Sequence, residues 1–183
     1  MSEYRKLTQR LIRHLHERDL VFEFFFVFSR LEYAVLRRGF IAGGNGGVSA
    51  NWDSFANRHT DDFKQDQSPD LQEAVDYFLK HPPKKQIAIS GNLAWSDAIP
   101  QENSKLLLRL LVLVRRVRNN LFHGEKLGQL IEGDSYRDAH LLRHGLAILY
   151  ACLSLSPEVR DEFFSETRLT LEEEEEQADG EVM

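Results

Sequence analysis

The sequence predicts an all-α fold, a bundle in which long helices form the core. Within residues 104–122 and again within residues 135–155, apolar residues recur at steps of three and four, the spacing of one face of an α-helix. The chain shows no internal repeat and no alternation of strands with helices, so packed helices are the favoured architecture. The apolar face of the first of these helices consists of Leu107, Leu110, Leu111, Val114, Val117 and Leu121.

The N-terminal part is expected to be helical up to a glycine-rich segment. Residues 4–18 place leucines on one side, and the aromatic-rich residues 20–38 form a second helix, or its continuation, that Gly39 would end. Residues 41–51 contain four glycines and are expected to be a flexible loop. This loop lacks the Lys-Ser/Thr pair that follows the glycines of a phosphate-binding loop in nucleoside triphosphatases.

Shorter helices are expected on both sides of the two long ones. Residues 52–63, capped by Asn51, and residues 70–79 precede the central helix, and a helix that starts at Pro157 follows residues 135–155. Residues 84–99 stay undecided, because their strand-like part is too short to assign. The central helix begins between residues 100 and 104 and runs to residue 122, before Gly124.

Composition predicts one cytoplasmic domain with an acidic tail. The domain covers residues 1–165, and residues 166–183 form a disordered tail; a tail that mimics or repels nucleic acid is the alternative. Without the seven acids of residues 172–183, the net charge of −6 becomes +1, so the low pI does not exclude an RNA substrate. Cys152 is the only cysteine, which excludes an intramolecular disulfide and a cysteine zinc site. We find neither a signal peptide nor an apolar stretch of membrane-spanning length.

Arg118 and His123 are the candidate catalytic residues. An imidazole transfers protons near neutral pH, and a guanidinium grips a phosphate and offsets its developing charge. At about 100° per residue, Arg118 falls inside the apolar stripe of the central helix, whereas Arg109 and Arg116 point away from it. We therefore expect Arg118 to point into an interior or an interface, where an unpaired charge is costly.

Helical geometry alone does not bring Arg118 and His123 together, because five residues place them about 140° apart. Two arrangements would join them. The helix could end at Phe122 or His123 so that the chain turns at Gly124, or the two residues could meet their counterparts from a second subunit across a two-fold axis. The alternative is a structural salt bridge of Arg118 and a helix-end histidine favoured by the macrodipole.

Glu32 is predicted to contact Arg118 or the neighbouring site. It shares an apolar stripe of residues 20–38 with Phe25, Ser29 and Leu36. Opposite charges on the apolar faces of two core helices suggest a pair, because an isolated buried charge is unfavourable. The alternative places Glu32 at the solvent edge of the stripe.

Three further sets of residues could form sites or have ordinary structural roles. A basic set could face RNA or solvent, and two histidine pairs could bind metal, although no third ligand is evident and we assign no metal site. The aromatic block of residues 22–28 suits a core or a dimer interface better than a platform for stacking bases. The basic set is Lys105, Arg109, Arg115 and Arg116, and the histidine pairs are His14 with His16 and His140 with His144.

Residues 118–123, Arg-Asn-Asn-Leu-Phe-His, resemble the signature of the HEPN family (higher eukaryotes and prokaryotes nucleotide-binding domains). That signature is an arginine, often followed by a polar residue, and a histidine after four to six intervening residues, at the end of a core helix. Residues 22–39, with Glu32, resemble the family's early helix, which often carries an acidic residue. The resemblance covers about residues 5–155 and implies a HEPN-like helical bundle.

The resemblance also implies a reaction. Many HEPN proteins are metal-independent endoribonucleases of toxin–antitoxin, CRISPR-associated and other antiviral systems, and they dimerise so that two motifs face one cleft. By this resemblance, His123 is the general acid/base, Arg118 holds the phosphate, and Asn119 orients His123 or binds RNA. Arg115, Lys126 and Glu32 are candidates for substrate binding, and no cofactor is implied.

Three functions are compatible with these residues. The first is an endoribonuclease of toxin or defence type that acts on RNA as a homodimer. The second is a non-catalytic HEPN module that binds RNA, a nucleotide or a protein partner. The third is a toxin held by an antitoxin, for example a small nucleotidyltransferase that modifies it.

Overall fold

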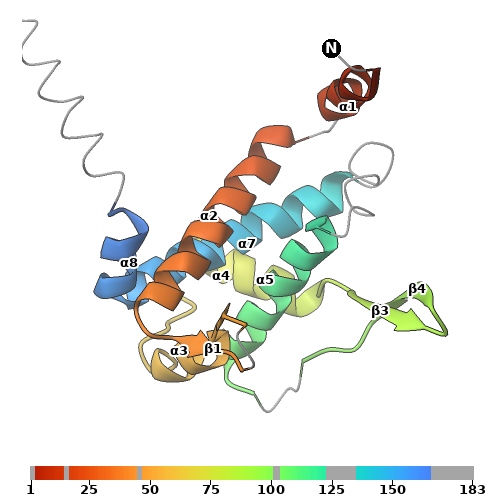
Figure 1. The fold of residues 1–183 in the computed structure, drawn as a ribbon. Helices are drawn as coiled ribbons and strands as arrows, with labels where there is room; N and C mark the ends of the chain where they lie inside the picture. Colours follow the sequence, from red (N-terminus) through yellow and green to blue (C-terminus); the bar gives the residue numbers. More distant parts are fainter. Residues whose placement is uncertain (1–2, 15–16, 45–46, 101–103, 123–134, 166–183) are drawn as a thin grey trace, which may run out of the picture.

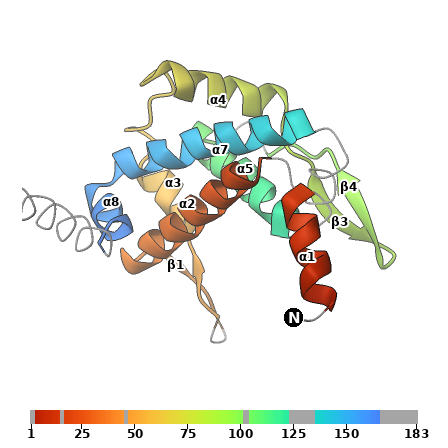
Figure 2. The same cartoon turned by 90° about the horizontal axis from the view of Figure 1, so that it is seen from above.

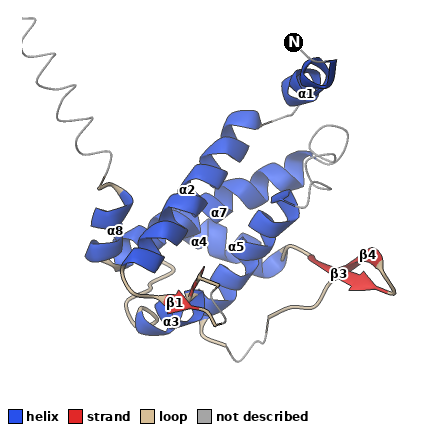
Figure 3. Ribbon diagram, in the orientation of Figure 1, coloured by secondary structure: helices blue, strands red, loops and turns tan. Residues whose placement is uncertain are grey.

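The computed structural model describes residues 3–14, 17–44, 47–100, 104–122 and 135–165. These residues form seven helices and two two-stranded hairpins (Figures 1 and 3). The helices are α1 (Glu3–His14), α2 (Arg18–Arg37), α3 (Trp52–Arg58), α4 (Pro69–Lys80), α5 (Leu106–Phe122), α7 (Ser135–Leu155) and α8 (Pro157–Phe163). The strands are β1 (Ile41–Ala42), β2 (Ser49–Ala50), β3 (Lys85–Ile89) and β4 (Asn92–Ser96).

The bundle is arranged around α7, which packs against α2, α4, α5 and α8. Seen from above, α7 lies between α4 on one side and α2 on the other (Figure 2). The first helix, α1, projects beyond the N-terminal end of α2 in both views (Figures 1 and 2). Its apolar residues Tyr4, Leu7 and Ile12 are exposed. The core therefore lies between α2, α4, α5 and α7, with α3 and α8 adding buried residues, and no described residue of α1 belongs to it.

The predicted apolar face of α5 is confirmed. Five of its six residues are buried, and Leu121 is half-buried. Leu113 and Asn120 are buried as well. The buried face of α5 is wider than its predicted apolar face because α5 packs against α3 as well as α7.

The helices α2 and α7 approach closely at Gly145. A Cβ atom at this position would lie 2.8 Å from Cε2 of Phe24, whose side chain is fully buried. A contact shorter than 3.0 Å forces a shift, and a ring packed inside a core has little room to move. The absence of a side chain at Gly145 therefore sets the distance between α2 and α7.

Side-chain caps fix the starts of three helices. Asn51 accepts a hydrogen bond from the backbone nitrogen of Ser54 at 2.9 Å, as predicted for the start of α3. Ser68 caps α4 and Ser156 caps α8 in the same way, each followed by proline at the first helical position. The helix expected over residues 52–63 ends earlier, at Arg58, and within the range 4–18 the structure describes α1 as Glu3–His14.

The prediction of an all-α fold is wrong at two places, because two short hairpins are present. Residues 41–51, expected to be a flexible loop, pair β1 with β2 in antiparallel register, Ile41 opposite Ala50. The undecided residues 84–99 pair β3 with β4. Ser90 and Gly91 join these strands with positive φ angles of 50° and 81°. A two-residue turn of this kind matches the twist of paired strands.

The expected acidic tail, residues 166–183, lies outside the described residues, and so does the segment 123–134 that follows α5. Within the described part of the chain, no helix combines the length and the apolar character that crossing a membrane requires.

We expect the Gly145→Ala substitution to lower the free energy of unfolding by about 1–3 kcal/mol, the usual range for overpacking a core. The loss should occur although alanine is the better helix former. Urea unfolding followed by circular dichroism measures it. The control is Ser154→Ala at an exposed position of α7, which should change stability by less than about 0.5 kcal/mol. A Gly145→Ala variant as stable as the wild type would contradict the close approach of α2 and α7.

Candidate functional site

Arg118 lies near the C-terminal end of α5 and faces α2, where it meets Glu32. Its Nη2 atom donates hydrogen bonds to Oε1 of Glu32 at 3.1 Å and to Oε2 at 3.2 Å. Both side chains are half-buried, with 31% of Arg118 and 29% of Glu32 exposed. The predicted contact between the two charges is confirmed. Arg118 lies at the edge of the interior, so its charge is partly accessible to solvent and to a ligand.

An amide and two aromatic rings also hold the guanidinium of Arg118. Nη1 donates a hydrogen bond to Oδ1 of Asn119 at 3.1 Å. The guanidinium carbon lies 4.9 Å from the ring centre of Phe28 and 5.6 Å from that of Phe122. Contacts of a cation with ring faces contribute roughly 0.5–1 kcal/mol each at exposed sites. The orientation of the guanidinium is therefore set from several sides.

Glu32 is positioned in turn by Trp52, a residue that the sequence did not single out. The indole nitrogen of Trp52 donates a hydrogen bond to Oε1 of Glu32 at 3.4 Å. Trp52 is almost fully buried, and its ring packs against Phe28 at 5.6 Å between centres. A tryptophan in the first turn of a short helix reads as a core residue, so no sequence signal pointed to this role.

Two hollows lie beside Arg118. The larger, of about 370 Å³, is almost entirely apolar and also involves Phe22 and Leu121. The smaller, of about 180 Å³, includes Glu32. Phe25 and Phe122 line both hollows, and their rings pack at 5.3 Å between centres. The ion pair thus borders a concave, aromatic surface formed by α2 and the end of α5.

The aromatic block of residues 22–28 divides between interior and surface. Phe24 and Phe28 are buried, whereas three other phenylalanines of α2 are 46–67% exposed. Phe122 on α5 is 59% exposed. Exposed aromatic side chains that cluster in this way mark interaction surfaces in many proteins. We call the set the aromatic patch; it consists of Phe22, Phe25, Phe26 and Phe122.

The other predicted site residues have different positions. Asn119 is exposed and lies against Arg118. Arg115, one turn earlier on α5, forms an ion pair with Asp53 of α3 at 3.8 Å. His123 and Lys126 lie outside the described residues. The structure therefore brings together Arg118, Asn119 and Glu32, and it places Arg115 beside α3.

One member of the basic set, Arg116, has a structural role. Arg116 is half-buried, and its Nη1 atom donates hydrogen bonds to the carbonyl oxygens of Ala98 at 2.7 Å and Pro83 at 3.4 Å. Burial lowers the pKa of this arginine. Arg116 therefore connects α5 to the chain on both sides of the β3–β4 hairpin, so neither RNA nor bulk solvent is its principal environment.

The histidine pair His140 and His144 forms part of a cluster between α4 and α7. Nδ1 of His140 lies 3.4 Å from Nε2 of His144, and the ring of Tyr77 packs against both. Burial lowers the pKa of His144, an effect that Glu73 partly offsets. In the described part of the chain, no three histidine, cysteine, aspartate or glutamate side chains form a group that could hold a metal ion.

An anion that binds Nη2 of Arg118 competes with Glu32 for it. The two formal charges cancel at contact distance, and the Nη2 hydrogen bonds are already directed at the carboxylate. A phosphate would offer the guanidinium an alternative acceptor of similar geometry. Phosphate binding therefore requires Glu32 either to share Arg118 or to release it.

No protein-family model matches the chain, and comparisons with curated proteins and with solved structures find no match either. The resemblance to HEPN proteins therefore stays a prediction from the sequence.

We expect the Glu32–Arg118 pair to contribute more to stability than an exposed pair does. A double-mutant cycle with Glu32→Gln and Arg118→Met should give a coupling free energy of about 1 kcal/mol, at the upper end for accessible ion pairs. The control cycle, Glu17→Gln with Arg143→Met, removes a more exposed pair joined at 3.1 Å and should give less than about 0.5 kcal/mol. Equal coupling in the two cycles would show that the aromatic surroundings of Arg118 do not strengthen its ion pair.

Proposed function

We propose that this chain is a metal-independent endoribonuclease of toxin or antiviral-defence type, with a HEPN-like fold. The observation that supports it is the setting of Arg118. It lies near the end of a core helix, half-buried, oriented by Glu32 and Asn119, and open to a concave surface. Phe122, which precedes His123 in the sequence, packs against the same guanidinium.

In the proposed reaction, His123 accepts the proton of a ribose 2′-hydroxyl as that oxygen attacks the adjacent phosphorus atom. The bond to the 5′-oxygen of the next nucleotide breaks, and a protonated imidazole donates the proton that this oxygen takes up. The products are a 2′,3′-cyclic phosphate and a 5′-hydroxyl. Arg118 binds the non-bridging oxygens and offsets their charge in the transition state. Arg115 and Lys126 would contact neighbouring phosphates.

Glu32 has a positioning role in this proposal. A guanidinium that is held by a carboxylate, an amide and two rings loses little freedom when phosphate binds, which lowers the entropic cost of binding. The same carboxylate keeps the charge of Arg118 compensated when RNA is absent.

The active form is proposed to be a homodimer that uses the aromatic patch. Single exposed apolar side chains are ordinary, but a cluster of four phenylalanines is costly to leave in water. The patch adjoins Arg118, so two copies related by a two-fold axis would bring both Arg118 side chains to one cleft.

A non-catalytic module that binds RNA, a nucleotide or a protein partner is the second candidate. The observation that favours it is the pairing of Arg118 with Glu32 and Asn119, as in a purely structural salt bridge. The experiments below separate the two functions.

Purified protein incubated with total RNA in excess EDTA is expected to cleave it. His123→Ala should reduce the rate by about 10²–10⁴-fold, the usual contribution of a general acid/base. Arg118→Lys should also lower the rate, because a lysine cannot make the two-pronged contact. Denaturing electrophoresis and analysis of the product ends give the measurement.

The control for the histidine is His81→Ala, which changes an exposed histidine at the end of α4 and should leave the rate unchanged. Cleavage that persists in His123→Ala would remove this residue from the chemistry. RNA binding without any cleavage by the wild type would favour the non-catalytic module.

The Phe22→Asp substitution is expected to convert a dimer into a monomer and to lower cleavage at least about tenfold, because a charge in an apolar interface is costly to desolvate. Phe22 is 67% exposed, so the fold of the single chain should not change. Light scattering coupled to gel filtration measures the mass. Leu93→Asp, at an exposed position of β4, is the control and should stay dimeric. A wild-type protein that is monomeric at tens of micromolar would overturn the dimer.

A further inference from the structure

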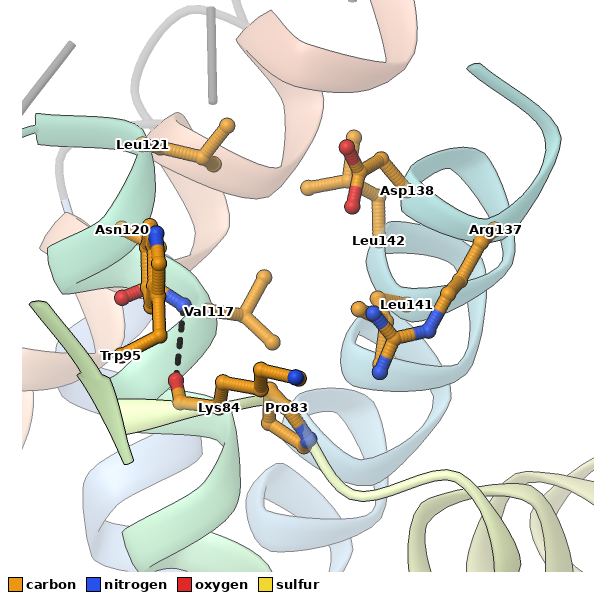
Figure 4. A pocket seen from close by; sticks show the side chains of 10 residues that line it. All are labelled: Pro83, Lys84, Trp95, Val117, Asn120, Leu121, Arg137, Asp138, Leu141 and Leu142. Carbon is orange, nitrogen blue, oxygen red and sulfur yellow. Dashed lines mark hydrogen bonds between the residues drawn. The ribbon is translucent and has the colours of Figure 1, made fainter. Parts of the chain in front are cut away.

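A second site lies on the other side of the end of α5, in a pocket of about 230 Å³ (Figure 4). Its walls come from the end of α5, the first turns of α7 and the β3–β4 hairpin with the residues before it. Trp95 and Val117 line one side, and Arg137, Asp138 and Leu142 line the other (Figure 4). The pocket does not include Arg118 or the aromatic patch.

Hydrogen bonds from three side chains hold the walls of this pocket in place. Asn120, which is 6% exposed, donates from Nδ2 to the carbonyl oxygen of Lys84 at 3.0 Å. Arg116 reaches the carbonyl oxygen of Pro83, and Arg137 that of Pro82 at 3.3 Å. The segment of residues 82–84 that leads into β3 is thus attached to both α5 and α7. The walls of the pocket are therefore held in place before any ligand binds, as is typical of ligand sites.

The charged residues of the pocket are Asp138, Arg137 and Lys84, and the ammonium group of Lys84 pairs with Asp97 at 3.1 Å. Asp138 is only 8% exposed, and its carboxylate points toward the space opposite Trp95 (Figure 4). Arg137 follows the same wall, and the rest of the lining consists of Lys84, Asn120, Trp95 and aliphatic side chains. A carboxylate has about four acceptor positions and a guanidinium five N–H donors, so each can bind a ligand in addition to its protein partners. The pocket therefore suits a flat ring that presents hydrogen-bond donors to Asp138 and, beside them, a hydrogen-bond acceptor to Arg137.

We propose that this pocket takes up one unpaired guanine base of the RNA, a specificity that rests on the ribonuclease function proposed above. Guanine carries two neighbouring N–H donors, N1–H and the N2 amino group, that one carboxylate can accept together. Its O6 and N7 atoms are acceptors for a guanidinium. The indole of Trp95 provides an aromatic surface against which an unstacked base can lie.

The other RNA bases match Asp138 and Arg137 less well. Adenine offers its N6 amino group but no second donor beside it, and cytosine likewise has a single amino group. Uracil has one N–H between two acceptors, which would face the carboxylate. A site with buried polar groups rejects a ligand that leaves those groups unpaired.

The pocket is close enough to the Arg118 site to act on the same RNA strand. Leu121 lines both this pocket and the apolar hollow beside Arg118. An RNA with a phosphate at Arg118 therefore passes the rim of the pocket. A neighbouring base can there turn away from the RNA backbone and enter the pocket. The two sites together would favour cleavage next to guanine.

Tryptophan fluorescence tests the pocket without any cleavage. GMP should quench the emission of the wild-type protein with a saturable curve, and AMP, CMP and UMP should bind at least about tenfold more weakly. IMP lacks only the N2 amino group and should also bind about tenfold more weakly. Trp52 is buried and remains as a constant background, so Trp95→Phe should abolish the quenching.

Two variants test the polar groups, each with thermal unfolding as a check on folding. Asp138→Asn and Arg137→Met should each weaken GMP binding about ten- to hundredfold. Arg143→Met is the control, because Arg143 also lies on α7 but pairs with Glu17 away from the pocket, and it should bind GMP like the wild type. If Asp138→Asn fails to fold, the Arg137→Met and Trp95→Phe results decide.

The outcomes separate this proposal from the proposed function. Equal affinity for the four nucleotides, or GMP quenching that survives in both Trp95→Phe and Arg137→Met, would overturn the guanine pocket. Cleavage of RNA by a protein that shows no GMP quenching would refute the pocket and leave the nuclease intact. Guanine-specific quenching in a protein that cleaves no RNA would support the pocket and refute the nuclease. A five-nucleotide RNA with one central guanine should bind more tightly than GMP. Weaker binding of this RNA would refute the proposal that the guanine in the pocket belongs to an RNA strand.

Discussion

The ion pair between Glu32 on α2 and Arg118 on α5 is the interaction on which the candidate site depends. It joins two core helices at the point where their apolar faces reach the surface. Either charge alone would be less favourable at this position, because burial removes part of its hydration and no partner would compensate for it. Together, and with Trp52 and two phenylalanine rings around them, the charges are compensated and oriented. A pair of this kind adds little net stability, but it fixes where a cation is presented.

The position of α2 explains why this cation lies beside an aromatic surface. Gly145 lets α2 approach α7 closely, so Phe24 and Phe28 are taken up by the core. The helix has other phenylalanines between these positions, and helical periodicity turns them to the outside. Phe122 extends that outer surface from α5. The packing that buries one side of α2 thus leaves the aromatic patch beside Arg118, where an interaction with another molecule would desolvate the ion pair and strengthen its electrostatics.

The C-terminal end of α5 contributes residues to both proposed sites. Arg118 faces α2, while Val117 and Asn120 face the pocket that α7 and the β3–β4 hairpin complete. Leu121 lies between them and lines both. The hairpin matters here because Trp95 reaches the pocket from β4, and Arg116 and Asn120 hold the flanking chain against α5. A strand pair that contributes nothing to the helical core therefore supplies one wall of the second proposed site.

The sequence by itself predicted the main helices, the Asn51 cap of α3 and a contact of Glu32 with Arg118 or the neighbouring site. Apolar spacing and capping are local properties, and a charge within an apolar stripe requires a partner wherever the helix packs. Only the tertiary structure decided which phenylalanines of residues 22–28 are buried, that Trp52 supports Glu32, and that Arg116 has a structural role. It also decided that residues 41–51 and 84–99 form hairpins and that α5, α7 and β4 enclose a pocket. These features depend on contacts between segments far apart in the chain, and local spacing does not encode which segments meet.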